Sequence, residues 1–128
     1  MTILKAILGS MLLMAPADAM AGNGGGAPGG VLELVRFRLV AGHDEGVFLA
    51  AAKGTEGLLA AQAGFVSRRL VSDGKGGWLD MVEWSSLDAA QRGAEQVMAE
   101  AAFAPFMAMI DPASVQMEHL PIRWQMGD

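Results

Sequence analysis

The sequence has no cysteine and only two histidines among its 128 residues. The absence of cysteine excludes disulfides, thiolate nucleophiles, zinc–thiolate sites and iron–sulfur clusters. No grouping of His, Asp and Glu has metal-site spacing, so we expect no metal. Basic residues are also scarce, with nine Lys and Arg against fourteen Asp and Glu and a net charge of −5. Because an acidic chain does not attract phosphate backbones, nucleic acid is not an expected partner.

Apolar residues, in contrast, are abundant. Hydrophobic residues make up 52% of the chain and charged residues 18%, which excludes a disordered chain and predicts a packed core. Three Trp, five Phe and ten Met supply its large side chains. The length suits a single domain.

The first 21 residues have the order of a secretory signal peptide. Lys5 precedes an apolar run over 6–15, and small-x-small patterns end at Ala19 and Ala21. We expect cleavage after Ala21, with Ala19 as the alternative. The apolar run is shorter than the about 20 residues of a membrane-spanning helix, so no stable membrane anchor should remain after cleavage. The expected location is the periplasm or the outside of the cell.

The remaining chain divides into a glycine-rich linker over 22–30, a domain over 31–122 and a short tail over 123–128. Within the domain, periodicity predicts four strands and two helices. The strands are expected over 31–40, 65–72, 78–84 and 114–120, and the helices over 45–62 and 85–102. The order β-α-β-β-α-β is that of a ferredoxin-like α+β fold, with a four-stranded antiparallel sheet and both helices on one face. Nothing remains to cover the other face, so we expect a homodimer that pairs sheet against sheet.

Side-chain patterns add detail to these elements. The first helix should bury one face, made by Phe48, Ala52, Thr55 and Leu59. Ser85 followed by Asp88 has the capping pattern of a helix start. In the second strand, Val66 and Leu70 should share a face opposite Ser67 and Arg69, and the glycines of 73–77 predict a hairpin.

Several short segments carry a family resemblance in their order and spacing. They are the first strand with its glycine turn (35–42), Gln62-Ala63-Gly64-Phe65, Trp84-Ser85-Ser86, Ala89-Ala90 and Ile110-Asp111-Pro112. From Val31 to Leu120 the chain resembles the dimeric α+β barrel superfamily, specifically the antibiotic biosynthesis monooxygenase-like domains. That family includes cofactor-free monooxygenases of polyketide quinols and haem-degrading enzymes. The resemblance implies a chain that needs no cofactor.

The site of the haem-degrading branch is not reproduced. That branch has an Asn on the first strand, a Trp at the end of the third strand and a His on the second helix. The tryptophan matches Trp84, but Val35 and Ala94 stand at the other two positions. Without an imidazole on that helix there is no proximal iron ligand, so haem degradation is not expected.

His119 is the candidate catalytic residue. By alternation it shares a face with Val115 and Met117, where it is either a base near the pocket of the family or an inert histidine at the end of the sheet. The candidate ligand-binding residues are Phe37, Trp84, Phe106 and Met117, each of which is either a pocket wall or plain core. The other histidine, His43, lies in a turn and should be solvated.

Charged residues on the strands are expected to fix the dimer interface. Val35, Phe37 and Leu39 should face the helices, while Arg36 and Arg38 face the partner. Possible partners across the strands are Asp80, Glu83 and Glu118. Asp80 and Glu83 face opposite sides of their strand, so they are not an acid–base pair.

Two functions remain open. The first is a cofactor-independent monooxygenase that acts on an aromatic or lipophilic small molecule. The second is a non-catalytic small-molecule-binding or stress-related homodimer of the same fold. Outside the cytoplasm NAD(P)H and free flavin are scarce, which disfavours an oxygenase coupled to a reductase.

Overall fold

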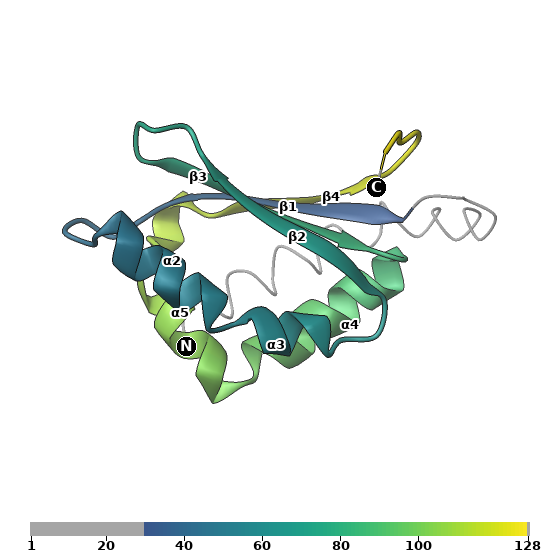
Figure 1. The fold of residues 1–128 in the computed structure, drawn as a ribbon, viewed down its shortest axis with the longest axis horizontal. Coiled ribbons are helices and arrows are strands. Elements are labelled where there is room, and N and C mark those ends of the chain that lie inside the picture. Colours follow the sequence, from purple (N-terminus) through teal and green to yellow (C-terminus); the bar gives the residue numbers. More distant parts are fainter. Residues whose placement is uncertain (1–29, 128) are drawn as a thin grey trace.

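A computed structural model describes residues 30–127 (Figure 1). The predicted signal peptide, nearly all of the linker and Asp128 lie outside the described residues. The strands are β1 (Val31–Arg38), β2 (Phe65–Ser72), β3 (Gly77–Trp84) and β4 (Gln116–Pro121). The helices are α2 (Glu45–Lys53), α3 (Glu56–Ala60), α4 (Leu87–Met98) and α5 (Ala104–Ala108), with short 3-10 turns at η2 (Ala101–Phe103) and η3 (Pro112–Ser114). None of the helices from 30 to 127 is long and apolar enough to cross a membrane.

The four strands form one antiparallel sheet in the order β2-β3-β1-β4. The helices lie on one face of it (Figure 1), so the predicted ferredoxin-like α+β fold is confirmed. In the central register, Val35 lies between Asp80 and Met117, and Glu33 lies between Val82 and His119. This register places residues from the two ends of the chain next to each other on the inner face.

The first helix is broken where the sequence predicts one continuous helix over 45–62. α2 ends at Lys53 and α3 begins at Glu56. Between them, the Thr55 hydroxyl donates a 2.6 Å hydrogen bond to the Ala52 carbonyl, an interaction that competes with the regular helical ladder. The predicted buried face is nevertheless correct, because Phe48, Ala52, Thr55 and Leu59 are all buried.

The second helix also differs from its prediction at both ends. Its cap is Ser86, whose Oγ accepts from the backbone N–H of Ala89 at 3.0 Å, and not Ser85. Ser85 lies in the bend between β3 and α4, where its backbone N–H donates to the Gly64 carbonyl. α4 ends at Met98, and the following apolar segment forms η2 and α5.

A register shift near the start of β2 changes which side chains face inward. The irregularity lies between Phe65 and Ser67, and such a bulge redirects the neighbouring side chains. The prediction that Val66 shares a face with Leu70 is therefore wrong, since the Val66 side chain is 51% exposed. Leu70 packs against the core as expected, and Arg68 faces inward with it.

The hairpin between β2 and β3 forms over 73–77 as predicted. Oδ1 of Asp73 accepts hydrogen bonds from the backbone N–H groups of Lys75 at 2.6 Å and Gly77 at 3.0 Å. These two bonds, first the one from Lys75, hold the pKa of the Asp73 carboxyl below its usual value. Gly74 and Gly76 supply the positive φ angles of the turn.

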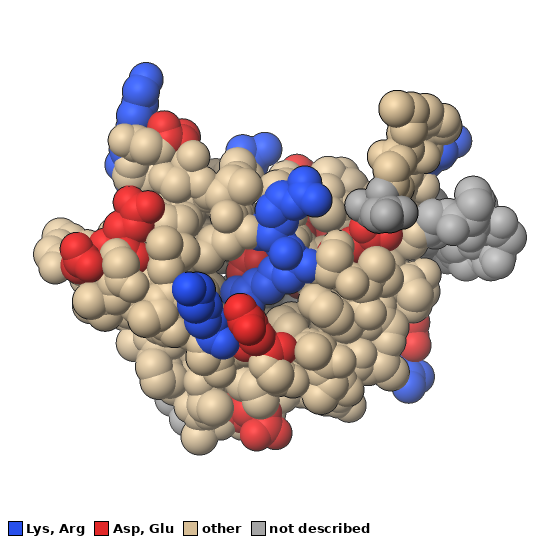
Figure 2. Space-filling view, in the orientation of Figure 1, with Lys and Arg blue, Asp and Glu red and all other residues tan. Residues whose placement is uncertain are grey.

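The outer face of the sheet carries the exposed Arg36 and Arg38, as predicted. The prediction that Asp80 is their partner is wrong, because Asp80 is buried on the inner face, where it binds Arg68. Glu83 and Glu118 do lie on the outer face, paired in register with Leu32 and Leu34. Figure 2 shows acidic and basic side chains mixed on the face in view.

Candidate functional site

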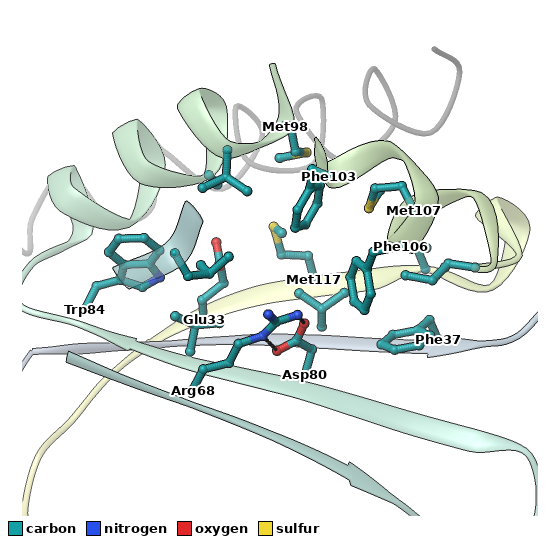
Figure 3. Close-up of a pocket in the computed structure, with 17 residues that line it drawn as sticks. Glu33, Phe37, Arg68, Asp80, Trp84, Met98, Phe103, Phe106, Met107 and Met117 are labelled. Carbon is teal, nitrogen blue, oxygen red and sulfur yellow. Dashed lines mark hydrogen bonds and ion pairs between the residues drawn. The ribbon is translucent and has the colours of Figure 1, made fainter. Parts of the chain in front are cut away.

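A cavity lies between the inner face of the sheet and the helices α4 and α5 (Figure 3). Its volume is about 70 Å³, several times the ~10–15 Å³ that one water molecule needs. The sheet contributes Glu33, Val35, Phe37, Arg68, Asp80, Val82, Trp84 and Met117, and the other segments contribute Leu59, Ala94, Val97, Met98, Phe103, Phe106, Met107, Ile110 and Val115. The lining is therefore mostly apolar, with three charged side chains.

All four residues predicted to bind a ligand line this cavity. Phe37, Trp84 and Met117 come from three different strands, and Phe106 comes from α5. They also belong to the core or pack against it, since Phe37, Trp84 and Phe106 are each at most 3% exposed. These residues are therefore part of the cavity wall and part of the core at the same time. Their binding of a ligand stays a prediction.

His119 is buried on the inner face, where alternation places it, but it is not on the cavity wall. Its Nε2 lies 3.0 Å from Oε2 of Glu33, and Glu33 does line the cavity. Where Glu33 is a carboxylate, which only accepts hydrogen bonds, Nε2 is the donor. The chemistry expected of His119 can therefore reach the cavity only through Glu33. His43 is exposed in the turn after β1 and takes no part in the site.

Glu33 was not identified from the sequence, although a signal for it exists. Glu33, Val35 and Phe37 are alternate residues of β1, and alternate side chains of a strand point to the same face. The sequence therefore predicts a carboxylate on the apolar face of β1. Its partner stands 86 residues away. No local pattern joins the two residues, and only the pairing of β1 with β4 brings them together.

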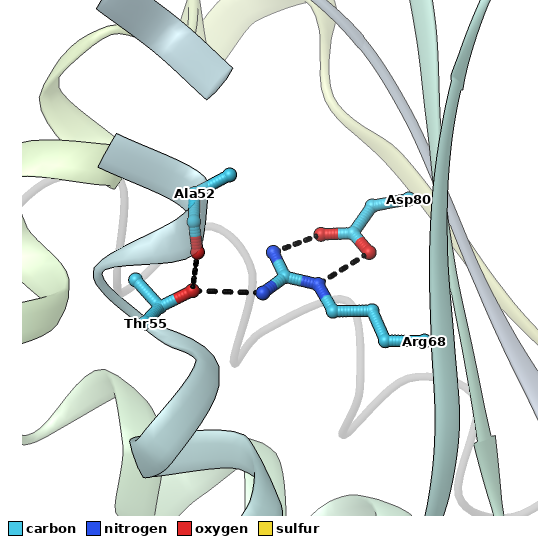
Figure 4. Close-up of polar contacts among 4 residues, drawn as sticks. All are labelled: Ala52, Thr55, Arg68 and Asp80. Atoms are coloured by element: carbon cyan, nitrogen blue, oxygen red, sulfur yellow. Dashed lines mark hydrogen bonds and ion pairs between the residues drawn. The ribbon is translucent and has the colours of Figure 1, made fainter. Parts of the chain in front are cut away.

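A second buried polar group is centred on Arg68 (Figure 4). Its guanidinium makes two hydrogen bonds to the Asp80 carboxylate, Nε to Oδ1 at 3.0 Å and Nη2 to Oδ2 at 2.7 Å. Its third nitrogen, Nη1, donates to the Thr55 hydroxyl at 2.7 Å. Thr55 in turn donates to Ala52. This group ties β2 and β3 to the break between α2 and α3.

The positive charge of Arg68 is paired within the protein, and three of its five N–H groups donate to protein oxygens. The guanidinium carbon also lies 5.1 Å from the centre of the Phe106 ring, a cation–π contact. Its side chain and that of Asp80 are only 13% and 12% exposed. An ion pair without net charge thus forms part of the cavity wall.

Trp84 is held in place by close packing on both sides. Its ring meets that of Phe65 edge-on, with centroids 5.9 Å apart. On the other side it lies against Gly93 of α4, where an added Cβ would approach the indole ring to 2.3 Å. Only glycine permits this contact. The position of Trp84 in the cavity therefore depends on a residue outside the lining.

Two buried polar atoms near this end of the cavity have no hydrogen-bond partner among residues 30–127. They are Nε1 of Trp84 and Nδ1 of His119. In the same part of the chain, no three His, Asp or Glu side chains gather as a metal site would require. Most buried polar groups in proteins are hydrogen-bonded, and these two atoms are exceptions.

Comparisons with known proteins identify structures of similar fold. No protein-family model and no curated protein matches the chain. The structure is similar to that of SnoaB, a cofactor-independent oxygenase from Streptomyces nogalater, in a mutant form. The TM-score is 0.58 and the identity 20%, over 77% of this chain and 97% of that one.

Two further solved structures are similar to this one. A protein assigned as an antibiotic biosynthesis monooxygenase, from Chloroflexus aurantiacus, has a TM-score of 0.51 at 17% identity, over 77% of this chain and 96% of its own. A dimeric ferredoxin-like protein from an uncultured marine organism has a TM-score of 0.54 at 10% identity, over 78% and 93%. At these identities the likeness shows the fold. The chain therefore has the ferredoxin-like α+β fold that these solved structures share.

Proposed function

We propose that this domain binds an aromatic or lipophilic small molecule in the cavity and oxidises it with molecular oxygen, without a bound cofactor. The observation that carries the proposal is a mostly apolar cavity whose wall includes the carboxylate of Glu33, with His119 behind it, while the other carboxylate of the wall, Asp80, is paired with Arg68. The oxygenase function named for SnoaB on this fold supports it.

The chemistry requires little from the protein. In a substrate whose CH₂ group is activated by flanking aromatic rings, a base removes a proton and the carbanion reacts with O₂. The CH₂ becomes C=O and one water is released, so the substrate itself supplies all four electrons. The protein has to position the ring, exclude bulk water and accept a proton. The apolar lining and the buried Glu33–His119 pair are suited to these tasks.

Filling the cavity is expected to abolish binding and turnover. Ala94 lies on the wall and is 7% exposed, so Ala94→Leu places three further carbons in the space that the ligand would occupy. We expect at least a tenfold loss (~1.4 kcal/mol) in affinity for dithranol, an anthrone, and in oxygen uptake with it. Calorimetry and an oxygen electrode measure the two.

The matched control is Ala50→Leu, which adds the same carbons at an exposed position of α2. This variant should behave like the wild type. Equal affinity and rate in Ala94→Leu and the wild type would show that the cavity is not the site. Binding without oxygen uptake in the wild type would instead favour a binding protein over an oxygenase.

We also propose that two copies of the domain pack through the outer faces of their sheets. In register, Leu34 and Met81 form the centre of an apolar strip on this face. Arg36 and Arg38 lie towards one end, and Glu83 lies towards the other. A two-fold axis through the centre sets the basic end of one copy against the acidic end of the other, which is electrostatically complementary.

Met81→Glu tests the dimer because it places a charge at the centre of the strip. We expect light scattering to give a dimer for the wild type and a monomer for Met81→Glu, since an unpaired charge at an interface core is costly. Val47→Glu is the control, since Val47 is a 57% exposed aliphatic residue on α2, and it should stay dimeric. A monomeric wild type would refute the proposal.

A further inference from the structure

As it stands, the cavity is smaller than one aromatic ring requires. Its volume is about 70 Å³, whereas an engineered cavity that holds benzene in another protein measures about 150 Å³. A ligand with one ring or more can therefore enter only if part of the wall moves outward. The helices of the wall differ in how firmly they are held, and this difference identifies the part that moves.

Two of these helices, α4 and α5, are fixed in place. α4 lies against the fully buried Trp84 at Gly93, where there is no room even for a Cβ atom. α5 is followed at once by Met109, whose carbonyl accepts a 2.9 Å hydrogen bond from the backbone N–H of Val40. Moving α4 outward would expose the tryptophan, and moving α5 would break backbone hydrogen bonds.

The third wall helix, α3, has few ties to the rest of the domain. It is five residues long and lies between α2 and α4 (Figure 1), and its one buried residue, Leu59, lines the cavity. A helix of this length is not stable without tertiary contacts. Gly54 precedes the segment, and Gly64 follows it with a φ of 86°. The Gly64 carbonyl accepts from the Ser85 N–H, so the segment between the glycines can swing while its far end stays anchored.

A hydrogen bond between Arg68 and Thr55 ties this segment to the sheet (Figure 4). Thr55 is the N-cap residue of α3, but its hydroxyl is bonded to Arg68 and Ala52 and does not cap the helix. The guanidinium also makes two hydrogen bonds to Asp80 that do not involve Thr55. The bond to Thr55 can therefore open while the ion pair stays intact, which avoids the high cost of an unpaired buried charge.

We propose that α3 is a lid on the cavity and that the Arg68–Thr55 hydrogen bond is its latch. When the bond opens, α3 moves outward and withdraws Leu59 from the wall, which widens the cavity enough for an apolar ring. The ring takes the space that Leu59 vacates, so the lid stays open while the ligand is bound. This inference deepens the proposed function and rests on it, because a lid has a role only if the cavity takes a ligand.

Native-state hydrogen exchange on the purified protein tests the lid without any ligand. The backbone N–H groups of Leu59 and Ala61 are bonded to the carbonyls of Thr55 and Gly57, and a helix this short loses these bonds when it leaves the wall. We expect both amides to exchange on the order of a hundredfold faster than interior amides of α4, with little dependence on low urea concentrations, because local opening exposes little surface. Equal rates and equal urea dependence in α3 and α4 would refute the lid.

Toluene, a single apolar ring, tests the latch. Thr55→Val removes the hydroxyl at nearly constant shape and frees the lid, so a larger fraction of the molecules is open. We expect this variant to bind toluene at least about tenfold more tightly than the wild type, since hydrogen bonds to charged groups are strong and the open fraction scales the apparent affinity. NMR exchange measurements should show faster association and an unchanged dissociation rate. A residue that only supported the fold would weaken binding when replaced.

Thr55→Ser is the matched control, because it keeps the hydroxyl to which Arg68 donates, and it should bind toluene like the wild type. If Thr55→Val binds no more tightly than Thr55→Ser, the latch is refuted and the cavity remains a binding site. If neither variant nor the wild type binds toluene, the lid fails together with the proposed function. Tighter toluene binding by Thr55→Val in a protein that does not oxidise dithranol would support the lid and contradict only the oxygenase activity.

Discussion

Replacing Arg68 with leucine is expected to destabilise the domain by about 3–5 kcal/mol, the range seen when one partner of a buried ion pair is removed. The change leaves the Asp80 carboxylate unpaired at 12% exposure and removes the partner of the Thr55 hydroxyl. It also removes the cation–π contact with Phe106. Urea denaturation followed by tryptophan fluorescence measures the effect.

Two controls show whether the loss comes from the stranded charge. Arg69→Leu alters the neighbouring arginine, which is exposed on the outer face, and should change stability by less than about 0.5 kcal/mol. The double variant Arg68→Leu with Asp80→Leu removes both charges and should recover much of the loss, because buried pairs are often replaced by apolar side chains without cost. A double variant as unstable as Arg68→Leu would contradict this account.

Gly93→Ala is expected to destabilise the domain by about 3 kcal/mol, near the upper end of the range for overpacked cores. The added Cβ would lie 2.3 Å from Cη2 and 2.4 Å from Cζ3 of Trp84. The indole ring cannot retreat freely, because it is fully buried and Phe65 lies against it. This cost exceeds the about 1 kcal/mol that alanine gains over glycine inside a helix. Thermal and urea denaturation measure it.

Gly57→Ala is the matched control for this prediction. Gly57 lies in α3, and a Cβ there meets nothing within 4 Å. The same substitution should therefore raise stability, by up to about 1 kcal/mol. If Gly93→Ala and Gly57→Ala shift stability in the same direction, then helix propensity and not the contact with Trp84 governs both positions.

Much of the architecture was predictable because it follows from local periodicity. Alternation along β1 places Val35 and Phe37 inward and Arg36 outward, as the structure has them. The bounds of β2 and the hairpin over 73–77 also follow from local signals, since strand residues end where glycines supply positive φ. A fold whose elements alternate in this order has few ways to bury both helices.

The predictions of helix ends are wrong where the local sequence is compatible with two structures. Ser85 and Ser86 can both cap α4, and only the pairing of the Ser85 N–H with Gly64 excludes the first. From the sequence alone, Thr55 fits within one continuous helix. In the fold its hydroxyl accepts from Arg68 and donates to Ala52, and the helix is interrupted there.

The candidate site has an apolar part that the sequence predicts and a polar part that it does not. The sequence by itself determined its apolar part, because Phe37, Trp84 and Met117 fall on inward positions of strands whose faces alternation sets. It also placed His119 on one face with Met117, where the structure has it buried. Only the tertiary structure decided the polar part, because Glu33 meets His119 across 86 residues and Arg68 turns inward after a bulge. Long-range strand pairing brings these groups together, and no local spacing encodes their contacts.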